Sequence, residues 1–105
     1  MKKTRDEILK SIKGVMLSVA PDGKIILFGS RARGEAREDS DWDLLILLDK
    51  PRIDNSDFDL ISYPLYELGW QEGEHFSPKL YTTKDWLKRS FTPFYKNIEK
   101  EGIVL

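Results

Sequence analysis

Residues 28 to 46 read FGSRARGEAREDSDWDLLI and connect two short apolar segments. The segments at 24–28 and 42–48 are almost wholly apolar and rich in β-forming residues, which predicts two buried strands. The glycine and serine that follow the first segment end its strand. Residues 31–40 are mostly charged, so we expect them to form a solvated turn or loop.

Two aspartates stand at the head of the second strand. Because side chains alternate along a strand, Asp41 and Asp43 share one face, roughly 7 Å apart, and Trp42 and Leu44 point into the core. Neighbouring carboxylates repel each other unless a cation lies between them, and paired carboxylate oxygens suit Mg²⁺. The spacing therefore predicts a metal-binding pair.

A phosphate-binding turn is predicted one strand away from this pair. Gly29 lets a phosphate approach the backbone closely, and Ser30 adds a hydroxyl donor. Arg31 and Arg33 follow directly and suit phosphate oxygens. For these two arginines and Arg37, contact with phosphate and simple solvation of the loop are equally favoured alternatives. A phosphate grip beside a metal pair indicates phosphoryl or nucleotidyl transfer from a metal-bound triphosphate.

Two longer helices are predicted around the strands. Residues 4–20 show one apolar stripe after a capping box. A second helix is expected to begin near Ser56, where residues 56–59 (Ser-Asp-Phe-Asp) fit a capping box. This motif repeats the order of residues 40–43, but the helical pattern after it favours a structural cap over a second site. Pro64 should kink or split the helix, and Gly69 should end it.

The remaining elements give the fold class. Residues 74–82 predict a weaker third strand, and Pro78 makes it either an edge strand or an irregular one. Short helices are expected from Thr83 and from Thr92-Pro93. The order α-β-β-α-β-α-α predicts an α+β fold in one domain, residues 1–105, with a small mixed sheet and helices packed on one face.

Composition excludes several classes of function. The 17 basic and 18 acidic residues give a net charge of -1, which argues against general nucleic-acid or anionic-membrane binding. The absence of cysteine excludes disulfides and thiolate sites, and the single histidine, His75, favours a surface role. The longest apolar run, residues 44–48, is too short to span a membrane, and the charged N-terminus is unlike a secretion signal. We therefore expect a cytoplasmic protein.

The central motif resembles that of a known superfamily. An apolar residue before Gly29-Ser30, a ten-residue spacer, and then Asp41 and Asp43 each followed by an apolar residue are similar to the signature of the DNA polymerase beta nucleotidyltransferases. Arg-Ala-Arg-Gly after the serine and Ser-Asp before the strand are similar to its minimal branch, the MNT proteins. The resemblance is dense over residues 28–48 and extends loosely over nearly the whole chain.

The resemblance implies a function and its residues. Gly29 and Ser30 would hold the triphosphate of ATP or another NTP, and Asp41 and Asp43 would bind the catalytic Mg²⁺. An acceptor hydroxyl would attack the α-phosphate, and pyrophosphate would leave. Minimal nucleotidyltransferases are frequently paired with a helical HEPN-domain protein, as antitoxin and toxin, and can adenylylate a tyrosine of that partner.

One position departs from the family pattern. The family usually has a third carboxylate on the third strand, and the corresponding residue here is Lys79. Alternation puts Lys79 on the polar face of that strand, and Glu74, the nearest acid upstream, on the wrong face unless Pro78 breaks the register. Lysine disfavours a second metal ion and is able to bind phosphate instead.

Two rival functions stay open beside the transferase. The first is a catalytically weak or inactive nucleotide-binding module that acts as an antitoxin-like partner, and Lys79 separates it from an active enzyme. The second is an enzyme that modifies a small molecule. The aromatic residues of the C-terminal part are expected to pack the core or to form a partner interface: Trp70, Phe76, Trp86, Phe91, Phe94 and Tyr95.

Overall fold

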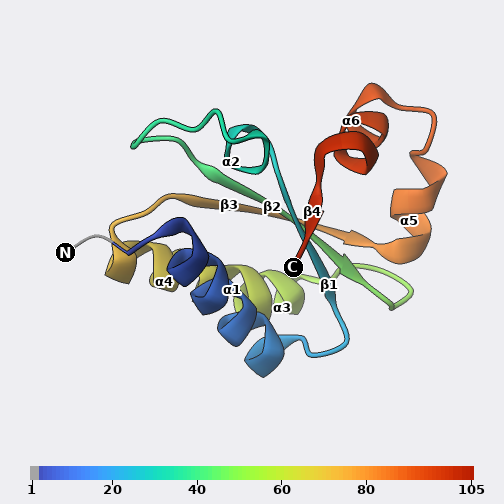
Figure 1. Ribbon diagram of the computed structural model, residues 1–105. Coiled ribbons are helices and arrows are strands. Elements are labelled where there is room, and N and C mark those ends of the chain that lie inside the picture. Colours follow the sequence, from blue (N-terminus) through green and yellow to red (C-terminus); the bar gives the residue numbers. More distant parts are fainter. Residues whose placement is uncertain (1–2) are drawn as a thin grey trace.

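A four-stranded mixed sheet runs through the protein and has helices on both faces (Figure 1). The computed structural model describes residues 3–105, and the strand order is β3-β2-β1-β4. The elements are α1 (Arg5–Val19), β1 (Lys24–Phe28), α2 (Ser30–Arg33), β2 (Trp42–Leu48), α3 (Asn55–Asp57), the π-helical turn η1 (Phe58–Ser62), α4 (Tyr63–Glu72), β3 (Phe76–Thr82), α5 (Thr83–Lys88), α6 (Pro93–Glu101) and β4 (Ile103–Val104).

Strand pairing brings the predicted motifs together. β1 runs antiparallel to β2, with Phe28 opposite Asp43, so the end of β1 meets the start of β2. β3 runs parallel to β2 at the edge of the sheet. No strand of the described residues 3–105 lies on the other side of β3, so the missing N–H of Pro78 is tolerated there. The predicted α+β fold is confirmed. The short β4, which the sequence pattern did not predict, pairs antiparallel with β1 through Ile103 and Val104.

The expectation of helices on a single face is wrong in detail. α1, η1 and α4 cover one face, where Leu27, Leu44 and Leu65 are fully buried. α5 and α6 cover part of the other face, where Trp86 and Ile98 pack against Ile26, Leu45 and Leu47 of the strands. Both faces need cover because β1 and β2 are apolar on both sides. Figure 1 shows α5 and α6 across the sheet from α1 and α4.

The first helix follows its sequence signals. The Thr4 hydroxyl accepts a hydrogen bond from the Glu7 backbone N–H at 3.2 Å, and the Glu7 carboxylate accepts one from the Thr4 N–H at 3.1 Å. Three residues of its apolar stripe, Ile8, Ile12 and Met16, are buried against the sheet. Capping and burial together fix α1 along this face.

The second predicted helix differs from expectation at its start, middle and end. Its capping box pairs Asp54 with Asp57, two residues before the predicted start. The chain does not split at Pro64, because η1 precedes it and the Tyr63 N–H bonds to the Phe58 carbonyl, five residues back. The helix ends at Gly73, which has φ 68°, instead of Gly69.

Gly69 has another role. A Cβ at this position would lie 2.7 Å from the Glu74 carbonyl oxygen, so its absence allows α4 to approach the start of β3. Residues 31–40 also differ from the predicted loop, because residues 30–33 form the helical turn α2. None of the helices described for residues 3–105 is long and apolar enough to cross a membrane.

Candidate functional site

Asp41 and Asp43 lie at the point where β2 begins. Trp42, between them, is 1% exposed and packs on the α1 side of the sheet, so the two aspartates face the other side. Asp43 lies opposite Phe28, the last residue of β1, and Asp41 is the more exposed of the pair. Alternation along the strand, as predicted, thus separates a buried indole from two carboxylates.

The electrostatics of the pair suit a bound cation. The pKa of the Asp43 carboxyl is raised above its ordinary value, first by burial and then by repulsion from Asp41. Lys79 and Arg33 act in the opposite direction and lower this pKa. A carboxylate held in the charged form against desolvation and a like charge is relieved by a cation, so these residues fit Mg²⁺.

Gly29 lies directly against Asp43. Its φ of 76° is in the left-handed region, and a Cβ there would overlap the Asp43 carboxylate. The Gly29 carbonyl accepts hydrogen bonds from the N–H groups of Ala32 and Arg33, both at 3.1 Å, and so begins α2 with Ser30 at its first position. The glycine is needed for this contact and backbone angle, in addition to the phosphate approach inferred from the sequence.

Arg33 lies on the aspartate side of the sheet. Its guanidinium donates hydrogen bonds to the carboxylate of Glu35 at 3.0 Å and to that of Glu101 at 3.3 Å. Glu101 is the last residue of α6. Its charge reaches Asp43, since it lowers the pKa of that carboxyl. Arg33 is therefore placed to meet an anion bound near the pair. The contribution of Glu101, 68 residues away in the chain, had no signal in the sequence.

Arg31 is turned to the opposite side. Its guanidinium stacks 4.5 Å from the Trp42 ring centroid and donates to the backbone carbonyls of Ser40 at 2.9 Å and Glu38 at 3.3 Å. Its side chain is 15% exposed and lies 3.7 Å from the Glu74 carboxylate. These contacts hold the loop that leads into Asp41, and they favour a structural role for Arg31 over phosphate contact.

The third strand places a lysine on the aspartate side. Lys79 is the register partner of Leu45 and Ser77 that of Asp43, so both share the face of the pair. Glu74 lies on the other face, where its carboxylate accepts from the Trp42 indole N–H at 3.1 Å. Glu74 is thus engaged away from the pair, as alternation predicted, and residues 3–105 contain no group of three acidic or histidine side chains arranged for a metal.

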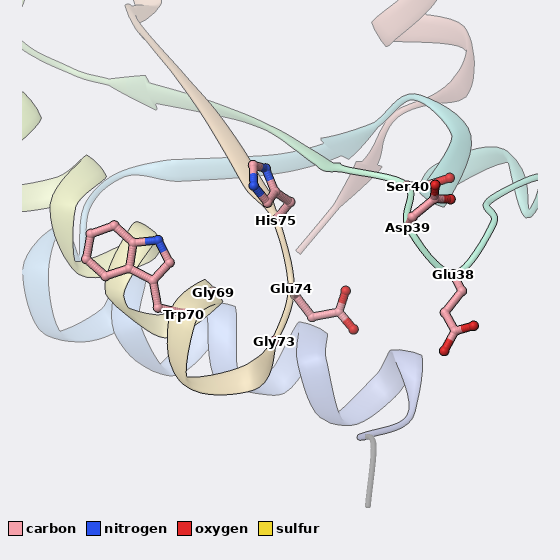
Figure 2. Close-up of a pocket in the computed structure, with 8 residues that line it drawn as sticks. All are labelled: Glu38, Asp39, Ser40, Gly69, Trp70, Gly73, Glu74 and His75. Atoms are coloured by element: carbon pink, nitrogen blue, oxygen red, sulfur yellow. The ribbon is translucent and has the colours of Figure 1, made fainter.

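A cleft of about 470 Å³ opens beside the aspartate pair and not over it. Figure 2 shows Trp70 of α4 on one side and residues 38–40 on the other, with Glu74 and His75 between them. The His75 ring nitrogen Nδ1 lies 3.5 Å from the Asp41 carboxylate, which joins the cleft to the pair. The residues predicted to bind nucleotide and metal do not line this cleft.

Solved structures share this fold over nearly the whole chain. A chain described as a minimal nucleotidyltransferase is 27% identical, with 98% of this chain and 97% of that one covered and a TM-score of 0.68. A toxin–antitoxin structure with AMP-PNP is 19% identical, with 97% and 72% covered and a TM-score of 0.63. A mutant of the toxin–antitoxin pair MntA–HpeT is 20% identical, with 99% and 72% covered and a TM-score of 0.60. The last two show the fold alone.

A family model gives the classification. The comparison with curated proteins finds no match. The model of the nucleotidyltransferase domain matches residues 8–105, which is most of the chain and includes β1, β2 and the turn between them. The solved minimal nucleotidyltransferase has nearly the same length and fold. The chain therefore belongs to the nucleotidyltransferase domain family and is a domain of the minimal type.

Proposed function

We propose that this protein transfers AMP from ATP to a hydroxyl acceptor on a partner protein, as one half of a toxin–antitoxin pair. The observation that carries the proposal is the contact of Gly29 with Asp43, at the point where β1 and β2 meet. This contact puts the predicted phosphate turn directly beside the predicted metal pair. The AMP-PNP in one structural neighbour supports an adenine nucleotide.

The residues have distinct roles in this proposal. Asp41 and Asp43 would hold Mg²⁺, which neutralises triphosphate charge when bound. The turn at Gly29-Ser30 would hold the triphosphate, and Arg33 would add a charge-assisted contact. The acceptor oxygen forms a bond to the α-phosphorus while the bond to pyrophosphate breaks, and the hydroxyl proton passes to water.

The protein partner is supported by the neighbouring structures, two of which are toxin–antitoxin assemblies. From the family resemblance we propose a helical HEPN-type protein. This assignment favours an acceptor on a macromolecule over a small-molecule substrate. The cleft between residues 38–40 and α4 is next to Asp41, so a bound protein segment has space to approach the site.

A second function, nucleotide-dependent binding without turnover, is favoured by Lys79. A unit charge about 4 Å from a cation is worth on the order of 4 kcal/mol at an effective dielectric near 20, which is enough to empty a weak Mg²⁺ site. Lys79 shares the face of the aspartate pair and acts on the pKa of Asp43. Its position therefore favours binding of one metal ion with the nucleotide over a two-metal arrangement.

The test is transfer of label from α-³²P-ATP, with Mg²⁺, to the protein encoded by the adjacent gene. An active transferase labels that protein and releases pyrophosphate, and Asp41→Asn or Asp43→Asn stops both. Lys79→Asp should strengthen Mg²⁺ binding and raise the rate. Absence of labelling by wild type and by Lys79→Asp, with ATP binding intact, would overturn the transferase in favour of the binding module.

A further inference from the structure

The outer face of α4 carries an uncovered row of aromatic side chains. Tyr63, Tyr66 and Trp70 are spaced three and four residues apart, so they share one side of the helix. They are 51%, 41% and 69% exposed, and the rings of Tyr63 and Trp70 meet edge to face at 6.0 Å. The opposite side of α4, with Leu65 and Gly69, is buried against the sheet layer. We call these three residues the α4 stripe.

The stripe extends at both ends. Phe58 and Leu60 in the preceding turn η1 are 49% and 63% exposed. At the other end Trp70 lines the cleft beside Asp41 (Figure 2). Single exposed apolar residues are common on a monomer, but a connected row of this kind marks an interaction surface. Tyrosine and tryptophan are the residues most enriched where such surfaces bind proteins.

The charge around the stripe identifies the chemistry of its partner. Residues 53–78 contain six acidic residues and neither lysine nor arginine. Four of the six form ion pairs with basic residues from outside this segment, namely Asp54, Asp57, Glu72 and Glu74. Asp59 and Glu67 flank the stripe, are exposed, and form no ion pair within the described residues 3–105. The cleft beyond Trp70 adds two more acidic residues to this surface, Glu38 and Asp39.

This charge disfavours two other occupants. A symmetric dimer through the stripe would bring the same acidic surroundings of both copies together, which costs free energy. An anionic lipid surface would be repelled for the same reason. A basic segment is attracted, and a row of aromatic side chains along one helix matches the apolar side of another helix.

We propose that the α4 stripe docks a basic amphipathic helix of a partner protein. Apolar side chains of that helix pack on Tyr63, Tyr66 and Trp70, while its lysines or arginines meet Glu67 and the acidic cleft. This inference rests on the proposed function in one respect: the partner that docks here is taken to be the protein that accepts AMP. The cleft includes Ser40 and His75 and so leads from the docking surface to Asp41.

The test uses three synthetic helical peptides with the same leucine stripe, flanked by lysine, glutamine or glutamate. The lysine peptide should bind most tightly in calorimetry, and 1 M salt should weaken its binding. It should shift the NMR signals of residues 58–70 and of the cleft at residues 38–40 and 73–75. Trp70→Ala should reduce its affinity about 30-fold, as expected for an aromatic residue central to an interface. Glu67→Lys should reduce it less, by about 5- to 10-fold at low salt.

Matched variants control for non-specific effects. Phe91→Ala removes an aromatic residue that is 77% exposed elsewhere, and Glu99→Lys makes the same charge change on α6; both should leave peptide affinity unchanged. Equal binding of the three peptides, no binding, or shifts that lie outside both residues 58–70 and the cleft would overturn the proposal. So would a concentration-dependent dimer that Trp70→Ala abolishes, because that assigns the stripe to a second copy.

The docking surface and the transfer reaction fail separately. Asp43→Asn should lose Mg²⁺-dependent nucleotide binding and keep the lysine peptide. Trp70→Ala should keep ATP binding, because Trp70 lies away from Gly29 and Asp43. If wild type binds the lysine peptide through the stripe but transfers no label, the transferase fails and the docking surface stands. If wild type fails to bind the lysine peptide, while wild type and Trp70→Ala transfer label at the same rate, the docking surface fails and the transferase stands.

Discussion

Residues 40–43 and 56–59 share the order Ser-Asp-aromatic-Asp, yet they adopt different structures with opposite burial. In the first, the strand alternates, so Trp42 is buried and Asp41 and Asp43 face the other way. In the second, the chain is helical, so Asp57 is buried and the residues after it, Phe58 and Asp59, are exposed. The backbone period thus decides whether the carboxylates or the aromatic ring enter the core.

Asp57, which is buried, and Asp43, which is half-buried, also differ in electrostatics. Asp57 accepts two hydrogen bonds from Lys50, at 2.8 and 2.9 Å, and one from the Asp54 N–H at 2.7 Å. Lys50 and this backbone donor lower the pKa of Asp57. Burial and Asp41 raise the pKa of Asp43. A carboxylate with its partners in place stabilises the fold, whereas one without them is available to a ligand.

The largest expected effect is on nucleotide binding. Asp43→Asn should weaken Mg²⁺-dependent ATP binding by more than about 100-fold, because loss of outer-shell partners alone costs metal sites 10- to 100-fold. Asp57→Asn should change this binding less than about twofold, since Asp57 lies in α3 and is bonded to Lys50, away from Asp41 and Asp43. Calorimetry with a non-hydrolysable ATP analogue measures both. Equal losses in the two variants would mean that residues 40–43 have no special role.

The sequence predicted most of what strand alternation controls. The two buried strands follow from continuous apolar runs and were found. The shared face of Asp41 and Asp43 and the opposite face of Glu74 follow from a period of two and were also found. The face of the sheet covered by α5 and α6 was not predicted. Apolar residues on both faces of a strand do not indicate which later helix covers which face.

Contacts between distant residues were the part that sequence could not supply. Arg31 was considered for phosphate, but its stacking on Trp42 depends on how residues 34–41 return to the sheet. Pro64 was expected to break a helix, and the wider turn η1 removed that need. Gly69 was placed at a helix end because its close approach to Glu74 arises only once β3 is packed. In each of these three cases tertiary packing, and not the local preference of the residue, determined the structure.

The next effect is on stability, and it is expected only in the second segment. Asp57→Ala removes the N-terminal cap interaction of α3 and the bonds from Lys50, so the free energy of unfolding should fall by about 1–2 kcal/mol. Ser56→Ala, at the neighbouring exposed position, is the matched control and should change it little. Urea denaturation followed by circular dichroism measures the difference. If only Ser56→Ala lowers the free energy of unfolding, the helix cap is at Ser56, as the sequence predicted.

The pH dependence of stability should differ between the segments. The lowered pKa of Asp57 contributes stability that is complete above its ordinary pKa, about 4, and that is lost as pH falls through the lowered value. Asp57→Asn should therefore be less stable than wild type at neutral pH, and the gap should close in acid. Urea midpoints at several pH values between 2 and 7 check this. A gap that stays constant would show that the charge of Asp57 has no part in it.

The smallest effect has the opposite sign and concerns Asp43. Its raised pKa means that the folded chain holds this proton more tightly than the unfolded chain, so the charged form destabilises the metal-free fold at neutral pH. Asp43→Asn should therefore raise the free energy of unfolding at pH 7. The gain should be below about 1 kcal/mol, because solvent screens a half-buried carboxylate. This advantage should shrink as pH falls through the raised pKa, and saturating Mg²⁺ should reverse it by stabilising wild type alone. If Asp43→Asn is instead destabilising without metal, Asp43 acts as a structural residue like Asp57, and the contrast between the two segments does not hold.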